Sequence, residues 1–361
     1  MLERGQKPRI LVAPLDWGLG HATRCVPIIH ELLNLGCEPW IAASGIQREM
    51  LESDFPCLHL LDLAGYGVLY DTDGKRFGRR IMLQVPRILN SIRKECLWLS
   101  ETHQKIGFQG IISDNRYGLH HPQIPSIFIT HQLAIKTGRG IWTDRQINWW
   151  NQRAISKFDA CWVPDWAGPD NLAGELSHPA QLPSNTIYLG PLSRLQPVEP
   201  ATKFPLLIIL SGPEPQRTLF ENILLQQLDN WNESFVLVRG VSHNDPIPAH
   251  PTGTIYNNQS TPHLNQLIAG AEFVISRPGY TSIMDLVKLQ KKMILVPTPG
   301  QAEQEYLFEE LTAKNMAVGS TQQQFNLTEL LSAAAQFNYN LPGAQKECFQ
   351  AVLKDWIAKL P

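Results

Sequence analysis

The sequence predicts an α/β fold with two parallel-sheet domains. Apolar runs of strand length alternate with helical segments along the chain, and this alternation is typical of parallel sheets with helices on both faces. Strand runs end at glycine turns that open a helix, as at Ser276–Gly279. The length of 361 residues exceeds one ordinary α/β domain and suits two, each large enough to bury its own core.

The first domain is predicted over residues 1–194. A helix is expected at Cys25–Leu35, ended by Gly36, and the segment Leu195–Pro200 that follows the domain has the composition of a linker. The predicted strands are Ile10–Pro14, Pro39–Ala43, Gly110–Ser113, Ile127–Thr130, Ala160–Val163 and Thr186–Leu189.

The second domain is predicted over residues 195–344, and a last helix over 345–361. Another helix is expected directly after Gly279, with Thr281 and Ser282 as its capping residues. The predicted strands are Pro205–Leu210, Phe235–Val238, Phe273–Ile275 and Met293–Pro297.

Composition narrows the class of protein. A hydrophobic fraction of 43% and a charged fraction of 18% describe a globular protein, and a net charge of −2 argues against bulk nucleic-acid binding. The six cysteines are scattered without a CxxC pair, so neither a zinc site nor a disulfide framework is predicted. We expect a cytoplasmic protein without a signal peptide or a spanning helix.

The loop after the first predicted strand, Asp16–Arg24, contains two glycines and a histidine. Gly18 and Gly20 allow close approach of the backbone, and His21 falls near the start of the next helix. The positive helix end lowers a histidine pKa and favours a neutral ring, so His21 is a candidate general base. It could equally donate to a diphosphate, or only order the loop. A dinucleotide fingerprint would need a third glycine in place of Thr23, which excludes a Rossmann oxidoreductase.

Two segments resemble the family 28-like glycosyltransferases, the group that includes the lipid II-forming UDP-N-acetylglucosamine transferase. One is RILVAPLDWGLGHATRCVPIIHEL, and the other is AEFVISRPGYTSIMDLVKLQKKMILVPTPGQAEQEY. The resemblance implies a GT-B fold, in which two Rossmann-like domains face a central cleft and the last helix crosses back to the first domain. In the second segment the matching motif positions are Ser276, Arg277, Gly279, Asp285, Pro297 and Gln304.

The resemblance also implies which residues bind the donor. Asp285 corresponds to the acidic residue that takes the ribose hydroxyls, although it is one carbon shorter than the family's usual Glu. Gly279, Tyr280 and Thr281 would turn backbone N–H groups toward the diphosphate, as a helix amino terminus does. Pro213 removes one donor from the neighbouring turn. The other expected donor-side residues are Gly20, Ser211, Gly212, Arg277, Gln301 and Gln304.

Asp114 ends a predicted strand at the same sheet edge as His21. It could orient His21, bind the acceptor or cap the next helix. A DxD at Asp71–Asp73 is the metal-binding pattern of another glycosyltransferase fold, but here the following Gly74 favours a turn. We therefore predict no metal and no cofactor, with the nucleotide-sugar as a substrate.

Two surfaces are candidates for the acceptor side. Residues 74–94 hold seven basic side chains and no acidic one, a pattern that fits either a segment near anionic lipid headgroups or an ordinary solvated helix face. The segment Gly138–Trp150 contains Trp142, Trp149 and Trp150, which could stack on sugar rings or lie in the core.

The predicted function is the transfer of a sugar, with inversion and without a metal, from a UDP-sugar to a sugar or lipid-linked acceptor. The protein would be cytoplasmic, with peripheral contact at the inner face of the membrane through residues 74–94, and would not bind nucleic acid. The alternatives are a nucleotide-sugar epimerase or hydrolase on the same fold, and a non-catalytic nucleotide-sugar-binding subunit.

Overall fold

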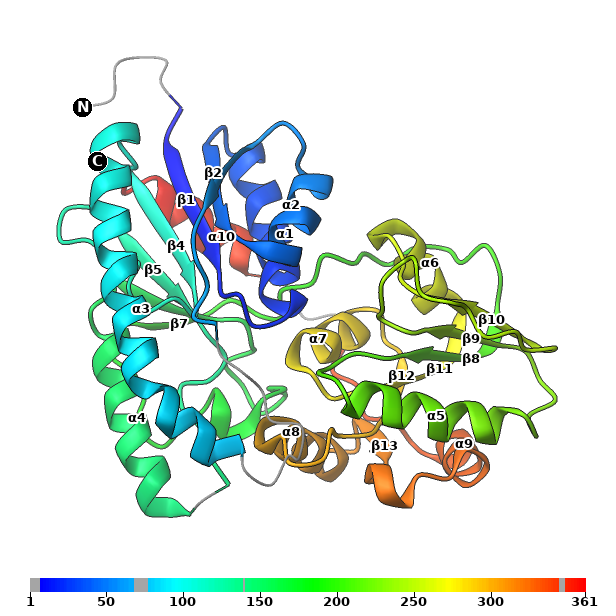
Figure 1. Ribbon diagram of the computed structural model, residues 1–361. Helices are drawn as coiled ribbons and strands as arrows, with labels where there is room; N and C mark the ends of the chain where they lie inside the picture. Colours follow the sequence, from blue (N-terminus) through cyan, green and yellow to red (C-terminus); the bar gives the residue numbers. More distant parts are fainter. Residues whose placement is uncertain (1–6, 68–76, 139, 344–347) are drawn as a thin grey trace. The chain divides into compact units, whose positions relative to one another are not determined.

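The computed structural model describes residues 7–67, 77–138, 140–343 and 348–361. The described chain forms two compact units, one of residues up to Leu192 together with those from Cys348 onward, and the other of residues 193–343. Each unit has its own parallel sheet, which confirms the predicted α/β class (Figure 1).

The first unit contains a seven-stranded sheet in the order β3-β2-β1-β4-β5-β6-β7, and all of its strand pairs are parallel. The central strands are mostly apolar and buried along nearly their whole length, because helices cover both faces of the sheet. The strands are β1 (Arg9–Pro14), β2 (Glu38–Ala43), β3 (His59–Asp62), β4 (Gly110–Asp114), β5 (Ser126–Ile129), β6 (Ala160–Val163) and β7 (Thr186–Tyr188). The helices are α1 (Leu19–Asn34), α2 (Gly45–Asp54), α3 (Phe77–Ile106), α4 (Ile141–Ile155), η1 (Gly174–Leu176) and α10 (Phe349–Ile357).

The second unit contains a six-stranded parallel sheet in the order β10-β9-β8-β11-β12-β13. Its core lies between this sheet and α5 and α9, where Phe220, Phe235 and Phe325 are buried. The strands are β8 (Phe204–Ile209), β9 (Phe235–Val238), β10 (Gly253–Tyr256), β11 (Ala271–Ser276), β12 (Lys292–Leu295) and β13 (Ala317–Gly319). The helices are α5 (Gln216–Leu228), α6 (Thr261–Gly270), α7 (Tyr280–Lys288), α8 (Ala302–Ala313), η2 (Gln322–Gln324) and α9 (Leu327–Gln336).

Helix α10, at the end of the chain, packs on the first unit. The Trp356 ring contacts Trp162 of β6 edge to face, with 5.7 Å between ring centroids. A Cβ at Gly110 would lie only 2.5 Å from the Trp356 ring, so the absence of a side chain there lets the indole approach β4. Leu353 of the same helix is fully buried.

Three details of the predicted elements are wrong. The first helix begins at Leu19 instead of Cys25 and contains Pro27. The cap of α7 is Gly279, so Thr281 and Ser282 lie inside its first turn. The strands β3, β10 and β13 were not predicted, and each lies at an edge of its sheet.

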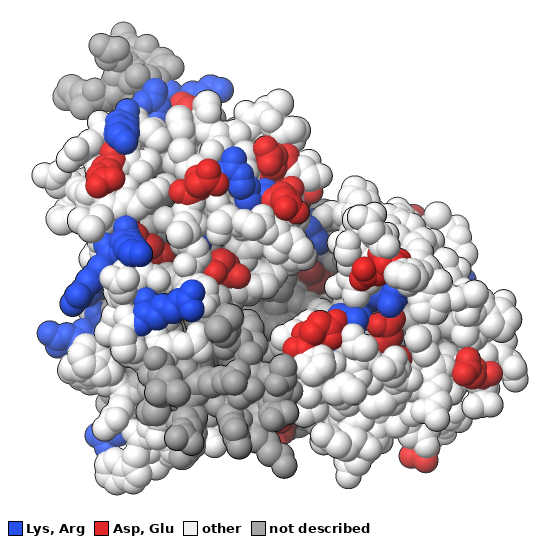
Figure 2. Space-filling view, viewed as in Figure 1, with Lys and Arg blue, Asp and Glu red and all other residues white. Residues whose placement is uncertain are grey.

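Helix α3 begins within the basic segment 74–94, of which residues 74–76 lie outside the described residues. Lys and Arg side chains gather on the side of the first unit that carries α3 (Figure 2). No helix in the described part of the chain is long and apolar enough to cross a membrane.

Candidate active site

The carboxyl end of the first sheet brings together the two residues expected to act in catalysis. Pro14 ends β1 and pairs in register with Asp114, which ends β4. The loop after Pro14 leads directly into α1, and His21 is the third residue of that helix. Residues 93 positions apart in sequence therefore meet, with 3.0 Å between His21 Nδ1 and Asp114 Oδ1.

Arg24 is the third member of this cluster, and it was not predicted from the sequence. It lies three residues after His21, so both project from the same face of α1. Its Nε donates to Asp114 Oδ2 at 2.6 Å, and its Nη2 donates to Oδ1 of the same carboxylate. Nη2 also lies 2.8 Å from His21 Nδ1, and Nη1 lies 3.4 Å from His131 Nδ1. Arg24 is 2% exposed and Asp114 is 0% exposed.

The cluster sets the charge of each member. Burial opposes the charge on Asp114, but Arg24 and His21 outweigh this effect and hold the pKa of the carboxyl at about 2. Burial and the Arg24 charge lower the pKa of His21, and Asp114 only partly offsets them. Burial also raises the pKa of the Cys25 thiol, whose Sγ donates to Asp114 Oδ2 at 3.7 Å. At neutral pH the cluster thus holds a carboxylate, a guanidinium and a neutral imidazole.

The loop that precedes His21 is fixed by side chains from neighbouring elements. Gln47 of α2 donates to the carbonyl oxygens of Leu15 and Gly18, both at 2.6 Å. Gly18 has a φ of 74°, a conformation that favours glycine. The Thr23 hydroxyl donates to the carbonyl of Gly20 at 2.9 Å. These bonds fix the backbone that carries His21.

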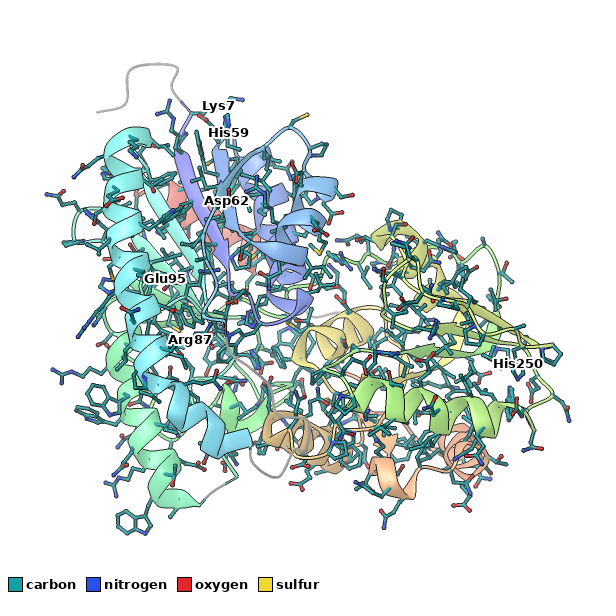
Figure 3. The ribbon with its side chains drawn as sticks, viewed as in Figure 1. Lys7, His59, Asp62, Arg87, Glu95 and His250 are labelled. Atoms are coloured by element: carbon teal, nitrogen blue, oxygen red, sulfur yellow. The ribbon has the colours of Figure 1, made fainter. Side chains whose placement is uncertain are left out.

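A buried ion pair lies beside this loop. Arg116 donates to Glu95 Oε1 of α3 at 2.8 Å and to the carbonyl of Pro14 at 2.7 Å, and neither side chain is exposed. Glu95 projects from the middle of α3, above Arg87 (Figure 3). Tyr66 completes the network by donating to Glu95 Oε2 at 2.9 Å. The pair fixes the end of β1 through the carbonyl of Pro14.

In the second unit, three turns meet at the carboxyl end of the sheet. They follow β8 at Ser211 and Gly212, β11 at Arg277–Gly279, and β12 at Val296–Gln301. Ser211 and Gly212 are exposed, and a Cβ at Gly212 would lie 3.7 Å from Thr298 Oγ1. This approach places the first and third turns side by side.

Two buried hydroxyl groups at this edge have no hydrogen-bond partner among the described residues. They are Ser276 Oγ at the end of β11 and Thr298 Oγ1 in the loop after β12, in residues 3% and 2% exposed. A buried hydroxyl without a partner costs free energy, so such groups at a sheet edge fit a site where a ligand supplies the missing bond.

Gly279, Tyr280 and Thr281 stand at the amino terminus of α7, where the helix dipole favours an anion. In the structure the Gly279 N–H donates to the carbonyl of Arg277 at 2.8 Å. Tyr280 is buried, and Thr281 is half-buried. The diphosphate role of these three residues stays a prediction.

Arg277 makes its hydrogen bonds inside the second unit. Its guanidinium is turned into the second unit, where Nη1 donates to the carbonyls of Val296 and Pro297, both at 3.0 Å. Nη2 donates to Gln322 Oε1 at 2.5 Å, and the group lies 4.3 Å from the Phe220 ring centroid. At 1% exposure the side chain joins β12 to its neighbours, while its Nε has no hydrogen-bond partner among the described residues. The donor-binding role of Arg277 stays a prediction. Burial lowers its pKa to about 10.

Asp285 lies on α7 and bonds within the second unit. The Ser193 hydroxyl donates to its carboxylate. Burial raises the pKa of Asp285 to about 6, which the hydrogen bond from Ser193 and the charges of Arg194 and Lys288 only partly oppose. The expected contact with a ribose stays a prediction, since it would have to share the carboxylate with Ser193.

The remaining donor-side residues shape the loop after β12. Gln304 Oε1 accepts the N–H of Thr298 at 2.9 Å, and Gln301 precedes the first residue of α8. Both side chains are half-buried. The DxD at Asp71–Asp73 lies outside the described residues.

Arg24, His131 and Thr298 were not predicted as site residues. The spacing of Arg24 from His21 could have identified it, because residues three apart share a helix face. His131 and Thr298 each follow a strand, at Ile129 and Leu295, and this is the only sequence signal they carry.

The chain is similar to known glycosyltransferases in sequence and in structure. Residues 212–352 match the model of the glycosyltransferase family 28 C-terminal domain. The glycosyltransferase of kitacinnamycin is 14% identical with a TM-score of 0.66, over 99% of this chain and 100% of that one. Spinosyn rhamnosyltransferase SpnG, complexed with thymidine diphosphate, is 15% identical with a TM-score of 0.62, over 98% and 97%. MurG of Acinetobacter baumannii is 15% identical with a TM-score of 0.55, over 98% and 100%.

No curated protein sequence matches the chain. At these identities the similar structures show a shared fold, and the expected GT-B fold is thereby confirmed.

Proposed function

We propose that this chain is a glycosyltransferase that transfers a sugar from a nucleoside diphosphate to an acceptor hydroxyl with His21 as the base. The match of residues 212–352 to the family 28 C-terminal domain supports this proposal. The observation that carries the proposal is the buried cluster of His21, Asp114 and Arg24. It keeps an imidazole neutral at the carboxyl end of a sheet, which is what proton abstraction at neutral pH requires.

In the proposed reaction, His21 takes the proton of the acceptor hydroxyl as the acceptor oxygen bonds to the anomeric carbon. The bond from that carbon to the diphosphate oxygen breaks at the same time, through an oxocarbenium-like state, and the anomeric centre is inverted. The departing diphosphate gains negative charge, which the amino terminus of α7 at Gly279–Thr281 would stabilise. No metal ion is needed in this scheme, because N–H groups and the helix dipole supply the positive potential.

The donor we propose is a UDP-sugar held at the carboxyl end of the second sheet. The family 28 domain match covers this region, and one similar structure is complexed with thymidine diphosphate, which supports a nucleoside diphosphate as the leaving group. Asp285 would bind the ribose, and Gln301 and Gln304 the sugar. Ser276 and Thr298 support the same location, because each has a buried hydroxyl without a partner.

On the acceptor side, we propose that the protein works at an anionic lipid surface. Helix α4 has an unusual arrangement, in which its polar side chains face the protein and its tryptophans face outward. Asn151 accepts from the Tyr117 hydroxyl at 2.8 Å, and Asn148 accepts the N–H of Ile135 at 2.6 Å. By contrast, Trp142, Trp149 and Trp150 are 77%, 54% and 66% exposed.

The outer face of α4 also carries the exposed Arg145 and Arg153, while the one acidic residue of the helix, Asp144, accepts the N–H of Thr137 at 2.9 Å. Tryptophan and arginine side by side suit the boundary between lipid headgroups and acyl chains. These exposures leave the core alternative for the tryptophans without support, and they add α4 to residues 74–94 as a membrane-contact surface in the proposal.

The donor site is tested by calorimetric titration with UDP, GDP, dTDP and ADP, first without metal and then with magnesium. The proposal expects metal-independent binding of one diphosphate, UDP, and loss of that binding in Asp285→Ala. Exposed Glu272→Ala is the matched control and should bind normally. If none of the four diphosphates binds, the proposed donor site is refuted.

A further inference from the structure

The contacts of His21 Nδ1 pose a conflict between two hydrogen bonds. Nδ1 lies 3.0 Å from Asp114 Oδ1, which can only accept, and 2.8 Å from Arg24 Nη2, which can only donate. A protonated Nδ1 satisfies the aspartate and leaves Nε2 as a base. An unprotonated Nδ1 satisfies the arginine, and Nε2 then carries the proton and cannot act as a base. The two tautomers correspond to the two roles open for His21, general base and phosphate donor.

The rest of the cluster decides between these tautomers. Arg24 already donates to both carboxylate oxygens of Asp114, through Nε to Oδ2 and through Nη2 to Oδ1, and its Nη1 lies 3.4 Å from His131 Nδ1. It therefore gains little from His21. An Nδ1–H gives the buried carboxylate of Asp114 a further charge-assisted bond, which is stronger than a bond to a neutral acceptor.

We propose that Arg24 is a positioning residue that holds Asp114 ionised, so that Asp114 accepts a hydrogen bond from Nδ1–H of His21 and the ring proton stays on Nδ1, which leaves Nε2 unprotonated. The inference deepens the proposed function, since it selects the base role for His21. Arg24 itself acts through Asp114 and takes no part in the bond changes of the transfer.

Arg24 also keeps the imidazole neutral. An unpaired buried carboxylate beside His21 would favour the imidazolium, and Arg24 cancels that charge within the same cluster. The charged or titratable groups that face His21 are Arg24 of α1, Asp114 at the end of β4 and His131 after β5. Cys25 contacts Asp114 but stays a neutral thiol, since its pKa is raised by burial. Arg24 is thus the main group that counters the charge of Asp114.

Nitrogen NMR of the imidazoles in the unliganded protein tests the tautomer and the charge of His21 without any substrate. With 15N-labelled histidine, the His21 signals are assigned by their loss in His21→Gln and followed over pH 5–8. The inference expects a neutral ring at pH 7 with the proton on Nδ1. A neutral ring with the proton on Nε2, or a charged ring at pH 7, overturns it. The result is independent of whether the enzyme transfers sugar, so it separates this inference from the proposed function.

Variants of Arg24 then test whether its charge is what keeps His21 neutral. Arg24→Gln removes the charge, and we expect the His21 titration to move to higher pH, with turnover reduced about tenfold more at pH 6 than at pH 8. Arg24→Lys keeps the charge, so its His21 titration and its ratio of turnover at pH 6 to turnover at pH 8 should lie close to those of wild type. Arg116→Gln is the matched control, a second buried arginine paired with a carboxylate in the same unit, and should leave the His21 titration unchanged.

An equal loss of turnover at both pH values with an unmoved His21 titration would mean that Arg24 is only structural. Removing one partner of a buried pair costs about 3–5 kcal/mol, so thermal melts accompany each variant. If Arg24→Gln does not fold, Arg24→Lys and the tautomer of the wild-type protein still decide the question.

Discussion

The ionisation state of His21 depends on side chains from two elements of the first unit. His21 and Asp114 could each be predicted from sequence, because each follows or ends a strand at the same sheet edge. Their 3.0 Å contact, and the guanidinium of Arg24 that contacts both, could not be predicted, because they depend on the register of β1 with β4 and on rotamers inside the core. Sequence position indicates which edge a residue reaches, and packing determines what it touches.

Arg277 shows what a linear pattern leaves out. A basic residue in a glycine turn before a helix is typical of phosphate binding, and Arg277 was expected on the donor side. In the structure, two carbonyls after β12 and the Phe220 ring hold the guanidinium inward. Which way a long side chain turns from a loop depends on carbonyl groups that other strands provide, and a linear pattern does not contain that information.

Asp285 provides a pH prediction. Its pKa is raised from 3.8 to about 6, so the folded state binds more protons than the unfolded state between these values. The contribution of this carboxyl therefore favours folding at low pH, and stability is lost as the pH rises through about 6. The difference of roughly two units is worth about 3 kcal/mol as an upper bound, because the side chain is half-buried.

We expect Asp285→Asn to unfold at a higher denaturant concentration than wild type at pH 7.5 and to lose that advantage at pH 4.5. The measurement is urea unfolding of both proteins at the two pH values, with Glu272→Gln as an exposed control. An Asn variant that is less stable at pH 7.5 would show that the ionised carboxylate is a net stabilising partner of Ser193, Arg194 and Lys288.

At the scale of elements, the inner strands of both sheets could be predicted because they are continuous apolar runs. The strands that were missed, β3, β10 and β13, lie at sheet edges, where one side has no neighbouring strand to bury it. Their composition is mixed, as in His59–Asp62, so no period or apolar run distinguishes them from loops. The start of α1 was placed too late because its first turn contains Gly20 and no apolar periodicity.

Helix α4 can be tested as a membrane-contact surface. We expect the protein to bind phosphatidylcholine vesicles that contain phosphatidylglycerol, and Trp149→Ser with Trp150→Ser to weaken binding about tenfold or more. Vesicle co-sedimentation at low and high salt measures this. The matched control is Leu219→Ser, an exposed apolar side chain on α5 of the second unit.

Equal binding by the double variant and wild type would exclude the α4 face from the contact. A wild-type dimer in light scattering that becomes a monomer in the double variant would assign the face to a second copy of the chain instead of a membrane.

At the scale of the whole molecule, the chain returns to its first unit at the end. Residues up to Leu192 and those from Cys348 onward form one compact unit, in which α10 packs beside α1, its Leu353 is buried and its Trp356 lies against Gly110 of β4. The first unit therefore includes residues that follow the whole second unit in sequence. Gly110 has room for the Trp356 ring only because it lacks a side chain.

We expect Leu353→Ala to destabilise the first unit by about 2–5 kcal/mol, the usual cost of removing a buried leucine side chain. Urea unfolding followed by tryptophan fluorescence measures it, and exposed Lys354→Ala is the control on the same helix. If Leu353→Ala unfolds at the same urea concentration as wild type, α10 does not contribute to the core of this unit.

The most direct test of the account compares His21→Ala with wild type in two assays on the same samples. One assay measures release of UDP from a panel of UDP-sugars with candidate acceptors, and the other measures UDP affinity by calorimetry. We expect His21→Ala to lose turnover by about two to four orders of magnitude while its UDP affinity stays within threefold of wild type. Turnover that survives in His21→Ala would contradict the assignment of His21 as the base, and a parallel loss of UDP affinity would place His21 in the donor site instead.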